Sequence, residues 1–234
     1  MKQWSIIRAL KDFRSLLFMD LCIACYSREP IPGKLFCLSC YAEIPYIKSQ
    51  DSIPALLIGK DDLPPEVEAF NSLFTYNKAD IIKKMIDNLK YRGRGDIGVK
   101  LGKQLGKLIS ETRDHEKRTL IPVPLHPKRL RERGYNQALK ISQGITEELD
   151  SSINESILLR IKYNESQTKK SAQERKGVKE QKFALSKSYK LDPDRHAIIV
   201  DDIITTGSTI SACYNLLKEA GYKRISVATL AITI

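Results

Sequence analysis

The sequence predicts an α/β protein in which buried strands alternate with helices, preceded by a small cysteine-rich module. Three observations carry this prediction. A buried strand runs into an acidic pair and a Thr/Gly turn at 197–210, strand and helix periodicities alternate from Phe70 onward, and two Cys-x-x-Cys pairs stand near the N-terminus. The 234 residues, 42% of them hydrophobic, are enough for a substantial core.

Composition limits the classes of function. The formal net charge of +11 makes anionic partners plausible without separating nucleic acid from phosphorylated metabolites. Residues 1–21 have the pattern of an amphipathic helix interrupted by charges, and not that of a secretory signal. No stretch of about 18 uninterrupted apolar residues occurs, so we expect no membrane span. Five cysteines without a secretory signal indicate a reducing cytoplasm.

The two cysteine pairs, Cys22/Cys25 and Cys37/Cys40, flank a short loop that contains Pro and Gly. Four thiolates at this spacing can surround Zn²⁺ tetrahedrally, which would leave no open position and make the metal structural. Two disulfides or four free thiols are the alternatives. A cytosolic setting disfavours the first, and the clustering of the four residues disfavours the second.

The middle of the chain reads as a connector followed by a strand and two helices. Residues 41–70 show little periodicity, Phe70–Tyr76 alternates as a strand does, and Ile81–Leu89 has helical spacing, as does 99–108. The segment from Lys83 to Lys107 is strongly basic, which fits either a solvated face or a ligand role.

The next strand, at 119–124, leads into an Arg-rich segment that closes at Gly134. We expect a loop here that approaches a pyrophosphate through backbone N–H groups and guanidinium groups, with Arg129, Arg131 and Arg133 as candidates. The alternative is the first turn of a helix with basic contacts to solvent. His126 alone is a weak candidate, because a single histidine in a loop more often packs than catalyses.

A polar segment at 162–187 separates the short apolar run Ile157–Ile161 from the next strand. Loops of this length inside a domain are uncommon unless they serve as lids, so the segment is predicted to be an active-site lid, with a plain linker as the alternative.

The most informative stretch begins with the strand Ala197–Val200. It is followed by Asp201 and Asp202 and then by the turn 205–209, where a helix begins. Backbone N–H groups at a helix start hold phosphate, and the two acids can take paired hydroxyls or hydrated Mg²⁺. The stretch therefore predicts a site for a phosphorylated sugar; ordinary strand-end and N-cap residues are the alternative. A helix with Cys213 on its apolar stripe and a final strand from Arg224 complete the chain.

This stretch resembles the phosphoribosyl-pyrophosphate (PRPP) motif of type I phosphoribosyltransferases. The order of motifs, from the cysteine pairs through Pro-Val-Pro-Leu-His, Arg-Gly-Tyr-Asn-Gln and Gln-Thr-Lys-Lys-Ser-x-x-Glu-Arg to the PRPP-like motif, is similar to the ComF family of competence proteins over nearly the whole chain. The resemblance implies a phosphoribosyltransferase-like parallel sheet flanked by helices at 76–234, a connector at 51–75, and an amphipathic helix with a four-Cys zinc module at 1–50.

The resemblance also implies roles for individual residues. Asp201 and Asp202 would contact the ribose hydroxyls as catalytic residues, together with Arg175 in a flexible loop that includes 169–175. The 5-phosphate and pyrophosphate would be held by Thr205, Thr206, Gly207, Ser208, Thr209, Leu125, His126, Lys128 and Arg129. Mg²⁺ would accompany PRPP, and Arg would help to stabilise the leaving pyrophosphate.

Three functions compete at this stage. The resemblance implies a ComF-type protein that binds PRPP-like ligands and single-stranded DNA during natural transformation, beside a helicase and the inner face of the membrane channel. The alternatives are an active phosphoribosyltransferase of unknown acceptor and a scaffold that binds PRPP as a signal. Little sequence follows the last strand to build an acceptor pocket, which weakens the enzyme hypothesis. Tyr91, Tyr135 and Tyr163 are isolated candidates for base stacking.

Overall fold

The computed structural model describes residues 21–60, 62–77, 81–111, 117–161, 182–187, 192 and 194–234. The helix predicted within residues 1–21 therefore falls almost wholly outside the described residues, as do Tyr163 and the predicted lid residues 169–175. Among the residues that are described, no helix is long and apolar enough to cross a bilayer.

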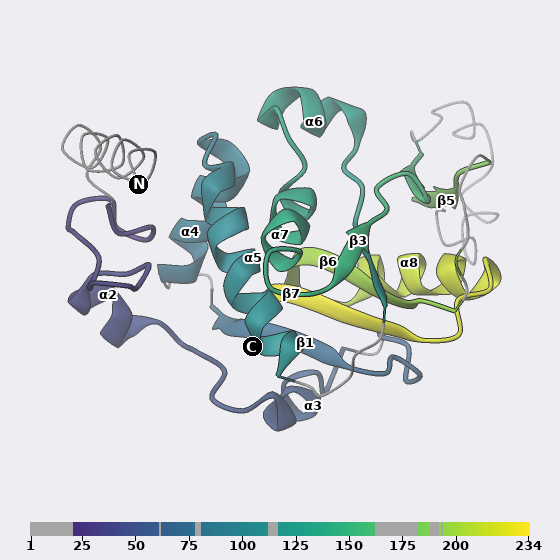
Figure 1. Ribbon diagram of the computed structural model, residues 1–234, viewed down its shortest axis with the longest axis horizontal. Coiled ribbons are helices and arrows are strands. Elements are labelled where there is room, and N and C mark those ends of the chain that lie inside the picture. The colour runs from purple at the N-terminus through teal and green to yellow at the C-terminus, as the bar shows by residue number, and fades with distance from the viewer. Residues whose placement is uncertain are drawn as a thin grey trace, which may run out of the picture.

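A five-stranded sheet, in the order β1-β7-β6-β2-β3, forms the centre of the molecule (Figure 1). Every neighbouring pair is parallel, which confirms the predicted fold class. The strands are β1 (Phe70–Tyr76), β2 (Arg118–Pro122), β3 (Ser151–Ile153), β6 (His196–Ile204) and β7 (Ile225–Thr233). The central strands β2, β6 and β7 are buried along nearly their whole length, as continuous apolar runs in parallel sheets require.

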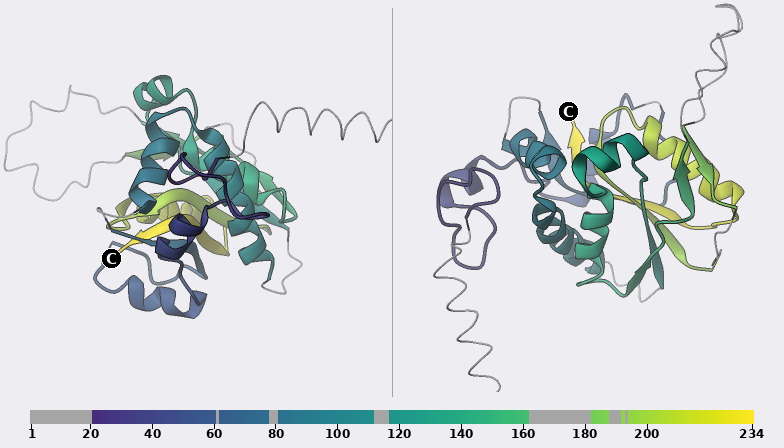
Figure 2. Two further views of the ribbon diagram at one scale, coloured as in Figure 1. Left: turned by 90° about the vertical axis from the view of Figure 1, so that its left-hand side faces the viewer. Right: turned by 90° about the horizontal axis from the view of Figure 1, so that it is seen from above.

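Helices cover both faces of the sheet (Figure 2). One face carries α4 (Ile81–Tyr91), α5 (Gly95–Ser110) and α7 (Gln137–Ile145), and the other carries α8 (Ser208–Glu219). Alternate residues of β6 supply the two cores: Ile198 and Val200 pack on the first face, whereas Ala197 and Ile199 pack on the second. The sheet is thus the middle layer of a three-layer sandwich.

Glycines allow α5 and α7 to pack unusually closely. A Cβ atom built on Gly102 would lie 2.1 Å from the carbonyl oxygen of Ile141, and one built on Gly144 would lie 2.1 Å from that of Val99. Both obstacles are backbone atoms, which cannot move aside as a flexible side chain can. The distance between these helices, and with it the position of α7 against β6 and β2, therefore depends on the absence of side chains at these positions.

The four-Cys segment and the connector lie against the edge of the sheet that ends in β1. They contain α2 (Leu38–Glu43), η1 (Gln50–Ser52) and α3 (Ile53–Leu56). Cys22, Cys37 and Cys40 share one buried cluster with Ile82 and Met85 of α4, so the cysteine segment is packed directly onto the domain. β1 spans the boundary predicted at 75/76 and is hydrogen-bonded to β7.

Three local features differ from the sequence-based expectations. β6 does not stop at the acidic pair but continues to Ile204, because Ile203 and Ile204 return to the apolar pattern of the strand. The Arg-rich segment expected as a loop forms the helix α6 (Pro127–Arg133), with Pro127 at its first turn and Gly134 in the left-handed region at its end, φ 77°. The polar stretch expected at 162–187 ends in a strand, β5 (Phe183–Leu185), which pairs antiparallel with β4 (Leu158–Arg160).

Substituting Gly102 by Ala tests the close contact of α5 and α7. We expect Gly102→Ala to destabilise the protein by about 2 kcal/mol or more, because a Cβ atom there overlaps the Ile141 carbonyl. Urea unfolding measures the change. Gly95→Ala is the matched control in the same helix: its Cβ would meet only the flexible Lys140 side chain at 3.4 Å, so its stability should stay within about 1 kcal/mol of the parent. Equal midpoints for the two variants would contradict the close-packing argument.

Candidate functional site: an acidic strand end and a phosphate turn

The strand order of the sheet reverses between β2 and β6, and we call the region at the carboxyl ends of these two strands the crevice. After β2 the chain passes through α6 and α7 to β3 on one side, whereas after β6 it passes through α8 to β7 on the other side. Val123 N–H donates a hydrogen bond to the Val200 carbonyl over 2.9 Å, so the two strand ends lie side by side. In open parallel sheets, ligands bind at such a reversal of strand order.

The turn between β6 and α8 presents hydroxyl groups and backbone N–H groups to this crevice. Thr205, Thr206 and Ser208 are exposed, and Thr206 Oγ1 lies 3.1 Å from Ser208 Oγ. Gly207 adopts φ 91°, and a Cβ atom there would lie 2.5 Å from Leu63, so glycine is required on both counts. The N-cap residue Gly207 has no side chain to cap α8, although Thr206 Oγ1 accepts a hydrogen bond from the Ser208 N–H over 3.3 Å. The N–H groups that follow in the first turn are thus available to a ligand.

A residue of the last strand, β7, fixes the backbone of this turn. Thr233 Oγ1 lies 3.1 Å from the Ile204 carbonyl oxygen and 3.3 Å from that of Thr205, and it can donate to either. Lys60 donates to Thr233 Oγ1 over 3.2 Å. The backbone entering the turn is therefore fixed by residues distant in sequence, and the turn does not depend on its own residues alone.

The second acid of the pair is neutralised by a lysine from α4. Lys90 Nζ lies 2.7 Å from Asp202 Oδ2, and the Asp202 side chain is only 5% exposed. A carboxylate buried to this degree needs a partner. The ion pair ties the C-terminal end of α4 to the strand end, and Lys90 thereby becomes part of the site.

The first acid, Asp201, forms no ion pair with the described residues, and its chemistry differs accordingly. Burial raises the pKa of Asp201, and the neighbouring charge of Asp202 raises it further. The Asp202 N–H, which donates to Asp201 Oδ1 over 2.8 Å, and the charges of Lys90 and Arg160 act in the opposite direction. The two adjacent acids therefore have different environments: one is held as an ion pair, and the other is poised to take a proton, a cation or a ligand hydroxyl.

Basic residues line the other side of the crevice. His126 caps α6 by accepting a hydrogen bond from the Lys128 N–H at its Nδ1, 3.2 Å away, which gives it a structural role in this state. Lys128 and Arg129 are exposed on α6. Arg160 of β4 is stacked 4.5 Å over the Phe183 ring, and both its burial and the charge of Arg129 lower its pKa.

Residues 135 and 136, which follow α6, hold neighbouring elements together through their side-chain hydrogen bonds. Asn136 Nδ2 donates to the Val123 carbonyl over 3.0 Å, while its Oδ1 accepts from the Ala138 N–H and caps α7. Tyr135 donates its hydroxyl proton to the Leu89 carbonyl. These contacts hold the end of β2 and the end of α4 against α7.

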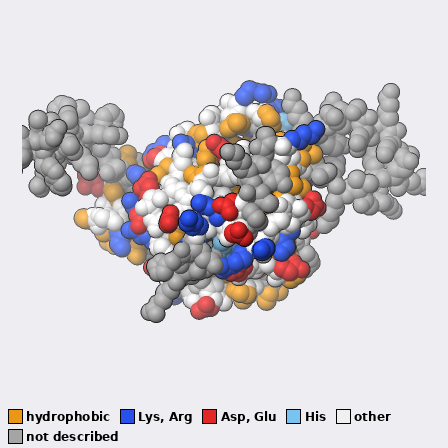
Figure 3. Space-filling model, turned by 45° about the vertical axis from the view of Figure 1, so that its right-hand side comes forward, with side chains coloured by type: hydrophobic (Ala, Val, Ile, Leu, Met, Phe, Trp, Pro, Cys, Tyr) orange, Lys and Arg blue, Asp and Glu red, His pale blue; other side chains and the backbone are white. Residues whose placement is uncertain are grey.

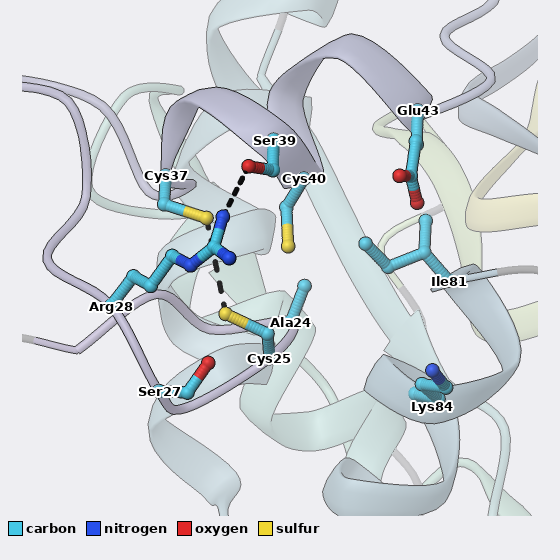
Figure 4. Close-up of a pocket in the computed structure, with 10 residues that line it drawn as sticks. All are labelled: Ala24, Cys25, Ser27, Arg28, Cys37, Ser39, Cys40, Glu43, Ile81 and Lys84. Atoms are coloured by element: carbon cyan, nitrogen blue, oxygen red, sulfur yellow. Dashed lines mark hydrogen bonds between the residues drawn. The ribbon is translucent and has the colours of Figure 1, made fainter.

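The four cysteines form a second candidate site, at the opposite end of α4. Figure 4 shows three of them, Cys25, Cys37 and Cys40, in a pocket that Ile81 and Lys84 of α4 also line. Their Sγ atoms all lie within 4.8 Å of one another, and Cys25 Sγ and Cys37 Sγ are 3.9 Å apart; none of the four forms a disulfide. Tetrahedral Zn–S bonds of about 2.3 Å require sulfurs about 3.8 Å apart. The thiols therefore fit a metal ion of this kind, and the group can hold one.

Cys213 does not belong to this group. It is completely buried in α8, and burial raises the pKa of its thiol, which agrees with its prediction as a core residue. Of the predicted site residues, Arg175 lies outside the described residues. The two acids and the turn 205–209 follow one another at the carboxyl end of β6, residues 125–129 lie at the start of α6, and the four cysteines form one cluster. Sequence reasoning missed Lys90, Arg160, Leu63 and Thr233. Only Lys90 left a signal, as part of the basic run from Lys83.

Comparisons with known proteins define the class of the domain. Residues 136–232 match the family described as "Phosphoribosyl transferase domain". A hypoxanthine phosphoribosyltransferase from Staphylococcus aureus superposes with a TM-score of 0.38 at 13% identity, covering 59% of this chain and 64% of that one, a likeness too low to carry an argument. The parallel sheet, its helices and the domain match together define a phosphoribosyltransferase-like protein.

Relatives give the narrower family. The chain is 39% identical over 112 residues to Competence protein F of Haemophilus influenzae, covering 48% of this chain and 49% of that protein. It is 30% identical over 161 residues to Competence protein ComFC of Bacillus subtilis, covering 69% and 62%. With ComFC of Streptococcus pneumoniae it shares 27% identity over 230 residues, covering 96% and 95%. The chain spans about half of the first relative and three-fifths of the second. It is a homologue of the ComF family of competence proteins, which confirms the resemblance inferred from its motifs.

The different environments of the two acids predict opposite effects on stability. Because the pKa of Asp201 is raised in the folded state, folding takes up a proton at this group, and stability falls as pH rises from the ordinary Asp range toward neutrality. Asp201→Asn removes the free-energy cost of holding an ionised carboxylate at this position. We expect it to raise the melting temperature, with a stabilisation larger by up to about 2 kcal/mol at about pH 8 than at about pH 5.

The adjacent variant Asp202→Asn is the internal comparison. It leaves the Lys90 ammonium without its buried partner and should destabilise the protein by about 3 kcal/mol. Thermal unfolding of both variants across pH measures the two effects. A shift of the same sign for both, or a stabilisation by Asp201→Asn that does not depend on pH, would contradict the division of roles.

Proposed function

We propose that this protein binds PRPP or a related phosphoribosyl ligand in the crevice between β2 and β6, and that it also binds single-stranded DNA and acts in DNA uptake during natural transformation. The observation that carries the proposal is the acidic pair near the end of β6, which is followed, after Ile203 and Ile204, by the hydroxyl-rich turn at the start of α8. A ribose phosphate needs both features: acceptors for its hydroxyls and N–H donors for its phosphate.

In this proposal, each side of the crevice contacts a different part of the ligand. Asp201 and Asp202 accept hydrogen bonds from the ribose hydroxyls, and the turn from Thr205 to Thr209 holds the 5-phosphate. Leu125, His126, Lys128 and Arg129 face the pyrophosphate from the start of α6. Arg160 adds a cation at the crevice, since it acts electrostatically on both Asp201 and Arg129.

Mg²⁺ enters this proposal as part of the ligand. The uncompensated Asp201 carboxylate is the group in the crevice best suited to a hydrated cation, because Asp202 already has Lys90. Mg²⁺ supplies charge neutralisation for the pyrophosphate. The chain's own contribution is to orient the ribose and to place positive side chains beside the anion.

The role in DNA uptake rests on the relatives named for competence. The net charge of +11 supports binding to an anionic polymer. We place the protein in the cytoplasm, at the inner side of the uptake channel, with a helicase of the uptake apparatus as a partner.

We propose zinc as the metal of the four-Cys cluster. Four thiolates favour Zn²⁺ over the oxygen-seeking cations and leave no open position, so the ion would fix the loops from Cys22 to Cys40 structurally. Those loops pack on α4, so the metal would support the helix that carries Lys90.

Calorimetry with PRPP tests the ligand site. We expect binding in the presence of Mg²⁺ and a loss of at least about tenfold in affinity for Asp201→Asn, about 1.4 kcal/mol, since a neutral amide cannot neutralise the cation. Asp201→Asn is expected to be folded, so the loss would not reflect unfolding. Asp194→Asn is the control and should bind as the parent does. Asp194 is an exposed acid, 87% accessible, just before the amino end of β6 and thus far from its carboxyl end. Equal affinities for all three proteins would refute the site.

Elemental analysis tests the cysteine cluster. We expect about one zinc per chain in the parent protein and in Cys213→Ser, and much less than one in Cys40→Ser. Cys213→Ser is the matched control because it removes a buried thiol outside the cluster. A parent protein with well under one zinc per chain, or a Cys40→Ser variant that keeps its full content, would refute the zinc proposal.

A further inference from the structure

An exposed tyrosine and an arginine meet beside the crevice, although they are far apart in sequence. Tyr91, at the end of α4, is 70% exposed. The Arg133 guanidinium, at the end of α6, lies 5.0 Å from the centroid of the Tyr91 ring, and Arg133 Nη2 lies 3.5 Å from its hydroxyl oxygen. Because the Tyr91 ring is this exposed, packing in the core is not the reason for a large aromatic side chain at this position.

Local contacts hold this pair in place. Arg133 Nη1 donates to Gln137 Oε1 over 3.0 Å, which fixes the guanidinium from the side of α7. Lys90, the residue before Tyr91, is directed to Asp202. Because consecutive helical residues point about 100° apart, the exposed Tyr91 ring points in a different direction from Lys90. The ring is thus a restrained surface group beside the PRPP site and does not belong to it.

The surroundings of the pair are cationic. Arg92 and Arg94 stand in the turn from α4 to α5, where Arg94 is paired with Asp96 over 2.7 Å. The helix α6 contains Lys128, Arg129 and Arg131 besides Arg133, against one acid, Glu132. Figure 3 shows Lys and Arg side chains at the top of the molecule, where α6 projects. Toward the cysteine segment, Arg94 lies 4.4 Å from the centroid of the Tyr26 ring.

Of the other tyrosines weighed for base stacking, Tyr135 is only partly exposed and donates its hydroxyl to a backbone carbonyl. The structure therefore distinguishes Tyr91 as the aromatic group available to a ligand on this surface. A flat exposed ring among guanidinium groups matches the chemistry of single-stranded nucleic acid, which offers bases to stack and phosphates to neutralise.

We propose that Tyr91 and Arg133 form a stacking platform for a base of single-stranded DNA, and that the arginines of the α4–α5 turn and of α6 contact the flanking phosphates. This inference rests on the proposed DNA-binding function and gives it a location. The bound strand crosses the rim of the PRPP crevice, because Lys90, next to Tyr91, contacts the acid of that crevice.

Fluorescence anisotropy with a labelled oligothymidylate of about 20 nucleotides tests the platform in the full chain. We expect Tyr91→Ala to weaken binding roughly 5- to 20-fold and Tyr91→Phe to bind nearly as the parent does, because stacking needs the ring and not the hydroxyl. On a base-free strand of the same length, Tyr91→Ala and the parent should bind equally. Tyr41→Ala removes a tyrosine that is 41% exposed on α2 and is the matched control.

The salt dependence of oligonucleotide binding tests the proposed phosphate contacts. Arg131→Gln, on α6, should reduce the slope of log affinity against log salt by about 0.7 between about 50 and 200 mM, the value for one phosphate contact to a single strand. Lys223→Gln removes an exposed lysine at the opposite edge of the sheet and should leave the slope unchanged.

The outcomes separate this inference from the proposed function. If the parent binds the strand but Tyr91→Ala binds it equally well, the platform is refuted and DNA binding stands. If the parent binds no oligonucleotide at low salt, both DNA binding and the platform fail. PRPP calorimetry on Tyr91→Ala should give the parent affinity in either case, and a loss there would assign Tyr91 to the PRPP site instead.

Discussion

The ion pair between Lys90 and Asp202 connects the parts of the molecule that matter for function. β6 carries two consecutive carboxylates near its carboxyl end, inside a sheet whose central strands are buried on both faces, and such a position cannot hold two uncompensated charges. α4 supplies a compensating cation, Lys90. Its first residue, Ile81, lines the pocket at the cysteine cluster, and its penultimate residue reaches the acidic pair. At 1.5 Å per residue, this helix separates the two sites by about 15 Å.

In this arrangement the cysteine segment packs against the helix that carries Lys90. Cys22, Cys37 and Cys40 share a buried cluster with Ile82 and Met85, on the helix that positions Lys90. On the other side, α5 and α7 meet at Gly102 and Gly144, and α7 in turn holds the end of β2 through Asn136. The two walls of the crevice are therefore fixed by different contacts: one by the packing under the cysteines, and the other by backbone contact between two helices.

The sequence allowed the local elements to be predicted where a periodic pattern was long enough. β1 was predicted with its observed bounds because Phe70–Tyr76 alternates as a strand does. The turn at Gly207 was predicted because threonines, a glycine and a serine follow the apolar strand and its two acids directly before a helical pattern. α6 was missed because a basic run without an apolar stripe resembles a loop, although Pro127 and Gly134 mark its ends. Lys90, Leu63 and Thr233 could not be assigned to the site, since their contacts span more than 25 residues of sequence and follow only from the folded chain.

The two acids differ in their electrostatic environment, and this difference limits which ligands the crevice can bind. Asp202 has its counter-charge inside the protein, so a ligand that replaces Lys90 must offer at least an equal interaction. Asp201 has the raised pKa of a buried carboxyl without an ion-pair partner, and any ligand that brings a cation or a hydroxyl donor relieves that cost. The site therefore favours a ligand that carries its own cation together with its phosphates, over a bare phosphate that offers neither. The magnesium-bound phosphoribosyl ligand that we propose would satisfy both conditions, because its hydroxyls and metal would meet the acids while its phosphate would meet the start of α8.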